Sequence, residues 1–225
     1  MKFGGIQKTS LIDFPDKIAT VLFTPGCNLR CPYCHNWRII LDPTGPFLSE
    51  KDTLQILEGR RRFVDAVVIT GGEPTIHADL PGFLRMLKEH GYLVKLDSNG
   101  LLPEILEKCI PHLDYIAVDV KTSPELYPKL KAESIDGLMK TIEMLKRSAV
   151  DYEFRCTTVP GFVDEDTVPR MGEMVEGARL FAFQQFIPGD TLDPAYNSKT
   201  PYTEERISQL ADIMASYVEE VTLRV

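Results

Sequence analysis

Six short apolar segments alternate along the 225 residues of the chain with stretches of helical periodicity. The apolar segments predict β-strands at 17–24, 64–70, 93–97, 115–120, 152–158 and 180–187. The periodic stretches predict helices at 49–62, 80–90, 103–109, 136–148, 167–176 and 203–219, and a short closing strand at 221–225. Pro43, Gly45 and Pro46 mark a loop, and residues 1–16 predict an extended segment packed on the domain. Regular alternation without a linker predicts one α/β domain over 1–225 with parallel strands.

Charged residues share one face of three successive predicted strands. The pattern places together Lys95 with Asp97, Asp119 with Lys121, and Glu153 with Arg155. Charges are rarely buried unless they are paired or functional, and parallel sheets are usually covered on both faces. A concave sheet that lines a polar cavity explains all three strands at once.

Three thiols follow the first predicted strand, where Cys27, Cys31 and Cys34 have the spacing C-x3-C-x2-C. A 4Fe–4S cluster is normally held by four thiolates, so three would leave one iron open to a small molecule. Zinc bound by the same thiols and His35 is the alternative, although adjacent side chains rarely converge on one tetrahedron. Cys109 and Cys156 are isolated and predict buried free thiols, so we expect a single cluster.

The stretch GGIQKTSLIDFPDKIATVLFTPGCNLRCPYCHN, from Gly4 to Asn36, resembles the radical S-adenosylmethionine (SAM) enzymes. It is most similar to the activating proteins of anaerobic ribonucleoside-triphosphate reductase, relatives of the pyruvate formate-lyase activating enzyme. The resemblance implies an incomplete (β/α)6 barrel, a 4Fe–4S cluster and SAM. It further implies that the reduced cluster cleaves SAM, and that the resulting 5′-deoxyadenosyl radical takes hydrogen from a glycine of the reductase. A reduced flavodoxin or ferredoxin is the implied electron donor.

The remaining motifs stand at strand ends, where sites in barrels of this kind lie. The resemblance implies that Gly71, Gly72 and Glu73 bind the methionine amino group, with a plain turn as the alternative. It assigns Asp119 and Lys121 to SAM contacts, with a buried ion pair as the alternative.

Further predicted cofactor contacts complete the set. Tyr33 and His35 flank Cys34, while Ser98 and Arg155 lie at the ends of the third and fifth strands. The pyruvate formate-lyase relative has a histidine after its last strand, and Gln185 is the predicted replacement here.

A sodium or potassium ion is predicted at Asp97, the Ser98 hydroxyl and Asp119, because two nearby carboxylates repel unless a cation intervenes. The pyruvate formate-lyase relative carries a similar turn and uses it this way. The alternative is that lysines and backbone N–H groups satisfy both carboxylates.

Composition restricts the class of partner. The net charge is −8 and no basic run is longer than Arg60–Arg62, which argues against nucleic-acid binding. The sequence shows no signal peptide and no membrane-spanning stretch, so a cytoplasmic protein is expected.

Other functions stay open at this point. The partner could be another glycyl radical enzyme, or the substrate a small molecule. A non-catalytic iron–sulfur or zinc module is the alternative from a different class. An electron carrier would need a fourth cysteine ligand and would have no need of the GGEPT motif or of charged strand faces.

Overall fold

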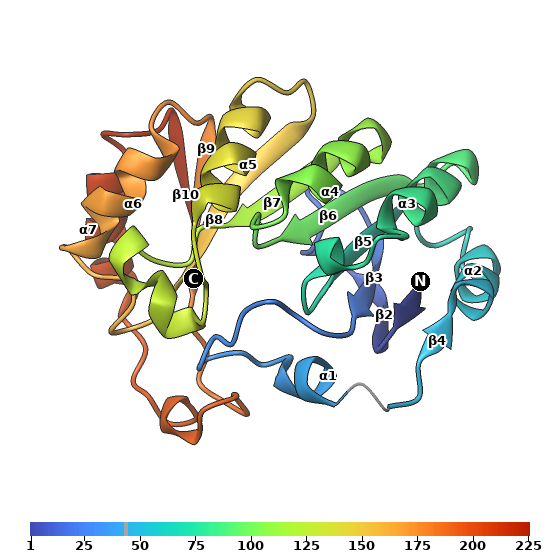
Figure 1. The fold of residues 1–225 in the computed structure, drawn as a ribbon, viewed down its shortest axis with the longest axis horizontal. Coiled ribbons are helices and arrows are strands. Elements are labelled where there is room, and N and C mark those ends of the chain that lie inside the picture. Colours follow the sequence, from blue (N-terminus) through green and yellow to red (C-terminus); the bar gives the residue numbers. More distant parts are fainter. Residues whose placement is uncertain (43–44) are drawn as a thin grey trace. The chain divides into compact units, whose positions relative to one another are not determined.

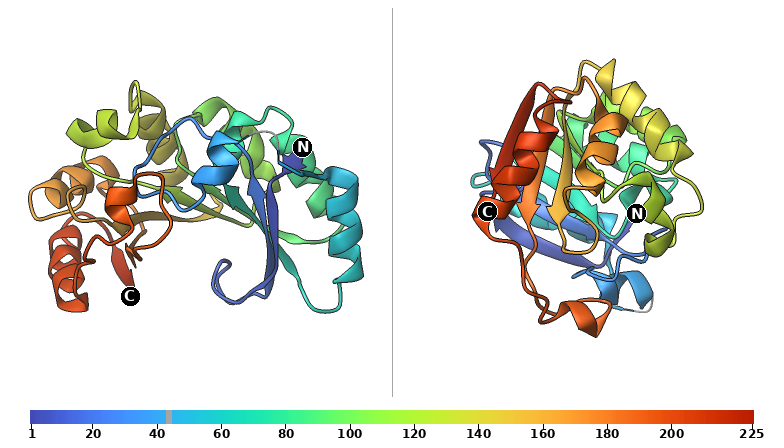
Figure 2. Two further views of the ribbon diagram at one scale, coloured as in Figure 1. Left: turned by 90° about the horizontal axis from the view of Figure 1, so that it is seen from below. Right: turned by 90° about the vertical axis from the view of Figure 1, so that its left-hand side faces the viewer.

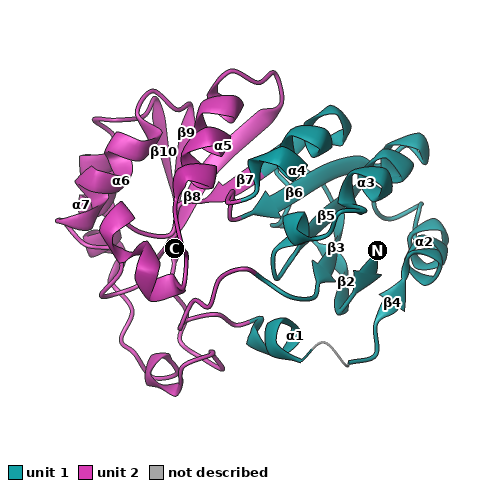
Figure 3. Ribbon diagram, in the orientation of Figure 1, with its two compact units in different colours: residues 1–27, 36–98, 102–116 teal, residues 28–35, 99–101, 117–225 magenta. Residues whose placement is uncertain are grey.

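The computed structural model describes residues 1–42 and 45–225, so the loop position predicted at Pro43 lies outside the described residues. The described chain divides into two compact units, which Figure 3 shows in separate colours. Unit 1 comprises 1–27, 36–98 and 102–116, and unit 2 comprises 28–35, 99–101 and 117–225. The single domain over 1–225 stays a prediction.

Unit 1 contains strands β1 (Lys2–Phe3), β2 (Gly5–Ser10), β3 (Ala19–Thr24), β4 (Leu48–Ser49), β5 (Ala66–Gly71) and β6 (Leu93–Ser98). Its helices are α1 (Trp37–Leu41), α2 (Glu50–Gly59), α3 (Leu80–Glu89) and α4 (Pro103–Cys109), with 3₁₀ helices at Pro74–Ile76 and Ile110–His112. The main strands lie in the order β2–β3–β5–β6 (Figure 1). The pairs β3–β5 and β5–β6 are parallel, whereas β2–β3 is antiparallel.

The core of unit 1 lies on the apolar runs that predicted β3 and β5. Ala19 and Val21 of β3 pack with Ala66 and Val68 of β5 and with Phe14 in one buried cluster. Strands of a parallel sheet that are covered on both faces need such near-continuous apolar sequences. The sequence pattern therefore identified the buried strands correctly.

The N-terminal segment is more ordered than the sequence predicted. Residues 5–10 form strand β2, which pairs with β3 and has an irregularity in register between Gln7 and Ser10. Figure 2 shows β2 and β3 together in blue. A bulge of this kind is common on edge strands, where it discourages further pairing.

Helix α2 begins at the cap that the sequence predicted. The Ser49 side chain accepts a hydrogen bond from the Asp52 backbone, and the Asp52 carboxylate accepts one from the Ser49 backbone. This capping box satisfies two otherwise unpaired N–H groups. The helix ends at Gly59, three residues before the predicted end, because Arg60 leaves the helical conformation at φ −110° and ψ 2°.

Strand β7 (Tyr115–Asp119) spans both units. Unit 2 contains strands β8 (Asp151–Thr158), β9 (Leu180–Gln185) and β10 (Glu220–Arg224), and helices α5 (Asp136–Lys146), α6 (Thr167–Val175) and α7 (Glu204–Met214). It also has 3₁₀ helices at Pro124–Leu130 and Pro194–Tyr196. β8–β9 and β9–β10 are parallel pairs, and α7 packs on β9 and β10 (Figures 1 and 2).

An ion pair between exposed Arg224 and buried Glu153 fixes the closing strand of unit 2. Arg224 of β10 donates to both carboxylate oxygens of Glu153 on β8, at 2.8 and 2.5 Å. Glu153 is only 1% exposed, so its charge needs this partner. The predicted closing strand at 221–225 is confirmed.

The predicted α/β class with parallel strands is confirmed. Each predicted strand and helix is present, the helix at 103–109 with the predicted ends and the others with shifted ends. Several short elements were not predicted: α1, the two-residue strands β1 and β4, and the 3₁₀ helices at Pro74–Ile76, Ile110–His112, Pro124–Leu130 and Pro194–Tyr196. Helix α1 has five residues, none of them buried, and therefore carries no apolar periodicity. None of the helices in the described part of the chain is long and apolar enough to cross a membrane.

Candidate active site

The predicted site residues fall in both units. Unit 1 holds Cys27, Gly71, Gly72, Glu73, Asp97 and Ser98, and unit 2 holds Cys31, Tyr33, Cys34, His35, Asp119, Lys121, Arg155 and Gln185.

A side chain at either of the two glycines at the end of β5 would meet backbone atoms. Gly72 N donates to Thr24 O at 2.8 Å, and a Cβ on Gly72 would lie 1.8 Å from Gly26 O. Gly71 has φ +110°, which favours glycine. Its carbonyl accepts from Asn36 Nδ2 at 2.8 Å. Close packing against the end of β3 and against Gly26 is enough to require both glycines. Their predicted contact with SAM stays a prediction.

The carboxylate of Glu73 is hydrogen-bonded to other residues of unit 1. Its Oε1 accepts from Thr75 N at 3.0 Å, from Thr75 Oγ1 at 2.6 Å and from Ser98 Oγ at 2.8 Å. The side chain is 1% exposed. Glu73 thus caps the 3₁₀ helix at Pro74–Ile76 and holds Ser98 at the end of β6, so two predicted site residues are brought together.

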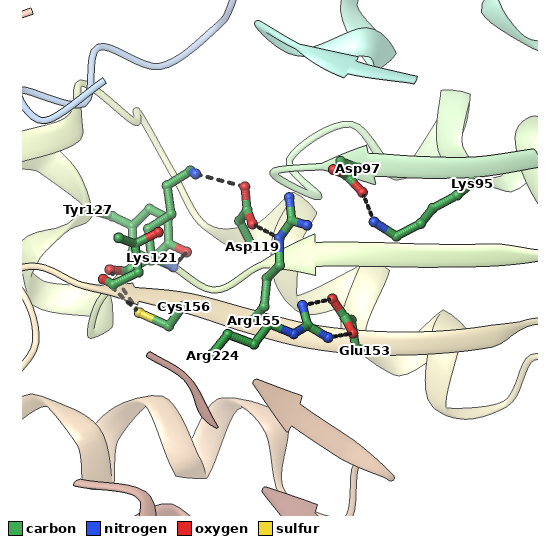
Figure 4. A network of polar contacts seen from close by, with 10 residues as sticks. Lys95, Asp97, Asp119, Lys121, Tyr127, Glu153, Arg155, Cys156 and Arg224 are labelled. Atoms are coloured by element: carbon green, nitrogen blue, oxygen red, sulfur yellow. Dashed lines mark hydrogen bonds and ion pairs between the residues drawn. The ribbon is translucent and has the colours of Figure 1, made fainter. Parts of the chain in front are cut away.

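Lys95 and Asp97 form a buried pair on β6. Lys95 Nζ donates to Asp97 Oδ1 at 2.6 Å, and the two residues are 2% and 6% exposed. Figure 4 shows both side chains on the same side of the strand, which confirms the face predicted from strand alternation.

Asp119 is the centre of a charged triad in unit 2. Its Oδ1 accepts from Arg155 Nε at 2.7 Å and its Oδ2 from Lys121 Nζ at 3.0 Å (Figure 4). Burial alone would raise the pKa of Asp119, but the Arg155 and Lys121 charges outweigh it and hold that pKa well below its usual range. Burial alone would lower the pKa of Lys121, but Asp119 keeps it above its usual value.

Tyr127 supports this triad and was not predicted. Its hydroxyl accepts from Lys121 N at 3.0 Å. Burial holds the pKa of Tyr127 above its usual value, so the hydroxyl stays neutral near pH 7. Tyr127 comes from the 3₁₀ helix that the sequence did not indicate.

Burial and neighbouring charges both act on the thiol of Cys31, in the C-terminal half of the cysteine motif. Cys31 is 8% exposed, and burial raises the pKa of its thiol while the Lys121 charge lowers it. The charges of Cys34 and Asp119 act in the same direction as burial and raise that pKa further. The Lys121 charge offsets only part of these effects, so the pKa of the Cys31 thiol is raised overall.

Within the described residues, no three His, Cys, Asp or Glu side chains are gathered in a group that could hold a metal ion. The cluster assignment therefore rests on the spacing of the thiols, and both it and the cation at Asp97 and Asp119 stay predictions.

A cavity of about 250 Å³ in unit 2 brings Tyr33, His35 and Gln185 together. His35 Nε2 donates to Ile187 O at 3.0 Å. Gln185 Nε2 donates to Phe186 O at 3.3 Å and to Tyr202 O at 3.1 Å, so its amide nitrogen is engaged by backbone. Whether Gln185 replaces the histidine of the relative stays a prediction.

Comparison with known proteins places the chain in a family. Residues 21–171 match the family described as the Radical SAM superfamily. A protein of Methanocaldococcus jannaschii, provisionally named a glycyl-radical enzyme activating enzyme, is 35% identical over 232 residues, which cover 98% of this chain and 95% of that protein. The pyruvate formate-lyase-activating enzyme of Clostridium pasteurianum is 25% identical over 201 residues, covering 85% of this chain and 83% of that enzyme.

A solved structure shows the same fold. Streptococcus suis SuiB, bound to its precursor peptide SuiA, matches with a TM-score of 0.69 and 15% identity, over 91% of this chain and 48% of SuiB. At this identity the likeness concerns the fold alone, and it agrees with the predicted incomplete barrel. Since the family match spans residues 21–171 and a relative 35% identical spans nearly the whole chain, this protein belongs to the radical SAM superfamily.

Proposed function

We propose that this protein is an activating enzyme that generates the glycyl radical of anaerobic ribonucleoside-triphosphate reductase. The observation that carries the proposal is the motif-bearing stretch from Gly4 to Asn36, which resembles the activators of that reductase. The M. jannaschii and C. pasteurianum relatives, both named as activating enzymes, support the broader class.

The residues present fit a 4Fe–4S cluster with SAM. Three cysteines of one short loop, Cys27, Cys31 and Cys34, would hold the cluster and leave one iron for the cofactor. When bound, the cluster and SAM supply one-electron cleavage and a radical that takes hydrogen from a C–H bond.

The charged triad suits the acidic end of SAM. Lys121 and Arg155 share one carboxylate, Asp119, so the triad carries one net positive charge. A partly buried site with this charge favours an anion such as the methionine carboxylate. The protein's own task is then to bind, orient and exclude water, because the cofactors carry the difficult chemistry.

The accompanying predictions belong to the same proposal. A reduced flavodoxin or ferredoxin would deliver the electron, and a sodium or potassium ion would accompany SAM at the acidic residues of the site. An enzyme that depends on such donors would work in the reducing cytoplasm.

Electron paramagnetic resonance of a mixture with the reductase tests the proposal. Anaerobically reconstituted and reduced protein, SAM and the reductase should give a glycyl radical signal, and a variant of the reductase without the glycine should not. Cys31→Ser is the control on the activator side. A radical formed in another glycyl radical enzyme but not in the reductase would overturn the assignment. SAM cleavage without a radical in either would favour a small-molecule substrate.

A further inference from the structure

A segment that follows β9 is bonded to the backbone of the cysteine motif. Leu192 N donates to Cys34 O at 3.1 Å, and Asp193 N donates to Pro32 O at 2.8 Å. Both partners lie in unit 2. The segment from 187 to 197 is called the strap below. No motif in the sequence indicated it, because its contacts are made by backbone groups.

Side chains extend the contact between the strap and the motif. His35 Nε2 donates to Ile187 O at 3.0 Å, and the Tyr33 ring lies 6.2 Å from the Tyr196 ring. Tyr33 also packs edge-on against Phe162 at 5.3 Å. Each residue from 32 to 35 therefore touches the strap, and the aromatic contacts are of a kind that favours one defined arrangement.

The strap is braced from within by Asn197. Its Oδ1 accepts from Thr191 N at 3.0 Å and from Thr191 Oγ1 at 2.8 Å. Thr191 is only 3% exposed, so these bonds are shielded from water. Asp193 Oδ1 accepts from Ala195 N at 2.9 Å and begins the 3₁₀ helix at Pro194–Tyr196. The amide oxygen of Asn197 thus closes the turn that contains Leu192 and Asp193, whose N–H groups bond to the motif.

Bracing matters because the motif has no regular structure of its own. Residues 28–35 contain no helix or strand, so carbonyl groups such as those of Pro32 and Cys34 need partners elsewhere. A cluster bound by three thiolates needs the loop ordered when it binds, and ordering a free loop costs conformational entropy. A loop that is already held in place loses less conformational entropy when the cluster binds.

We propose that the strap is a positioning element that holds residues 32–35 ready for the cluster, and that Asn197 and Tyr196 are its principal positioning residues. The inference rests on membership of the radical SAM superfamily and not on the identity of the partner enzyme. Removing a group that orients a metal ligand from outside typically lowers metal affinity by about 10- to 100-fold.

Three variants at the brace test this. In Asn197→Ala, anaerobically reconstituted protein should release iron to a chelator about tenfold faster or more. Asn197→Asp should restore slow release, because both bonds from Thr191 use an oxygen acceptor. Ser198→Ala, the neighbouring position, is the matched control. The electron paramagnetic resonance spectrum of the reduced cluster should change in Asn197→Ala and return in Asn197→Asp.

Hydrogen exchange of the apoprotein gives a second readout that needs neither cluster nor partner. Amides of peptides covering 28–35 should exchange faster in Tyr196→Ala than in the wild type, and Tyr196→Phe, which keeps the ring contact, should match the wild type. Thermal unfolding establishes that each variant is folded. Iron release, spectrum and exchange that are all unchanged in folded Asn197→Ala and Tyr196→Ala would overturn the proposal. If Asn197→Ala does not fold, the comparison of Tyr196→Ala with Tyr196→Phe decides alone.

Discussion

Arg155 Nε lies 2.7 Å from Asp119 Oδ1 and ties β8 to the end of β7. The second oxygen of Asp119 is taken by Lys121 Nζ at 3.0 Å, so both oxygens of one carboxylate are engaged by cations. A ligand that reaches this carboxylate must share it with Arg155 and Lys121. A ligand carboxylate would instead find two cations already in place.

Replacing Asp119 by Asn should separate SAM binding from cluster binding. In the variant no carboxylate orients Lys121 and Arg155 or contacts SAM directly. SAM affinity should therefore fall by tenfold or more, about 1.4 kcal/mol, although the site becomes more positive, while the iron content stays unchanged. Equilibrium binding of SAM and iron analysis on the same preparation check this. Loss of iron together with SAM would show that Asp119 acts on the cluster loop itself.

Acid should weaken the fold through the same carboxylate. The pKa of Asp119 is lowered in the folded protein, so its stabilisation is complete above the unfolded value of about 4. That stabilisation is lost as pH falls below 4 toward the lowered pKa. Denaturant unfolding of the apoprotein between pH 3 and 7 should therefore show a shallower pH dependence for Asp119→Asn. Asp212→Asn, at an exposed position of α7, is the control and should follow the wild type.

The five cysteines should divide into two groups. Cys109 and Cys156 lie outside the motif and are buried. Burial raises the pKa of Cys109 to about 12 and that of Cys156 above its usual value, as it also raises that of Cys31, so the division rests on the spacing of the motif. Serine at either position should leave about four irons per chain. Serine at any cysteine of the motif should abolish the stable cluster. Loss of iron in folded Cys109→Ser would show a fourth protein ligand.

Gly72→Ala should damage the protein even without ligand. The new Cβ would lie 1.8 Å from Gly26 O, which is backbone and cannot move cheaply, so unfolding free energy should fall by about 2 kcal/mol or more. Gly82→Ala is the matched control: it lies in α3 with no atom within 4 Å of the added carbon, and should be neutral or stabilising by about 0.5–1 kcal/mol. Equal stability of the two variants would remove the packing explanation for Gly72.

Local patterns predicted the strands well, because burial on both faces leaves a continuous apolar run such as 66–69. Strand alternation also placed Lys95 with Asp97 and Glu153 with Arg155 on shared faces. What it could not supply was a partner from a distant part of the chain. Glu153 is neutralised by Arg224, 71 residues away, and no spacing rule connects the two.

The strap and Tyr127 were beyond prediction for a related reason. The strap bonds to Cys34 and Pro32 through its own N–H groups, which every residue except proline has. Tyr127 comes from a 3₁₀ helix that contains Pro128. This helix is too short to give a periodic signal in the sequence. Motifs in the sequence thus named the residues expected to touch the cofactors, whereas the residues that position them appeared only in the structure.

The predicted sodium or potassium ion can be tested through Lys95, the cationic side chain that is already bonded to Asp97. Lys95 Nζ lies 2.6 Å from Asp97 Oδ1, so the lysine supplies part of the positive charge for which the ion was invoked. If the ion is nonetheless bound, SAM cleavage should be roughly tenfold slower, about 1.4 kcal/mol, in tetramethylammonium chloride than in sodium or potassium chloride at equal ionic strength. In Lys95→Met the carboxylate loses its internal cation, and the dependence on added ion should become steeper because a buried charge needs compensation. Denaturant unfolding in each salt separates this effect from a loss of stability. Equal rates in all three salts for the wild type would remove the ion, leaving Asp119 as a direct cofactor contact and Asp97 as the structural partner of Lys95.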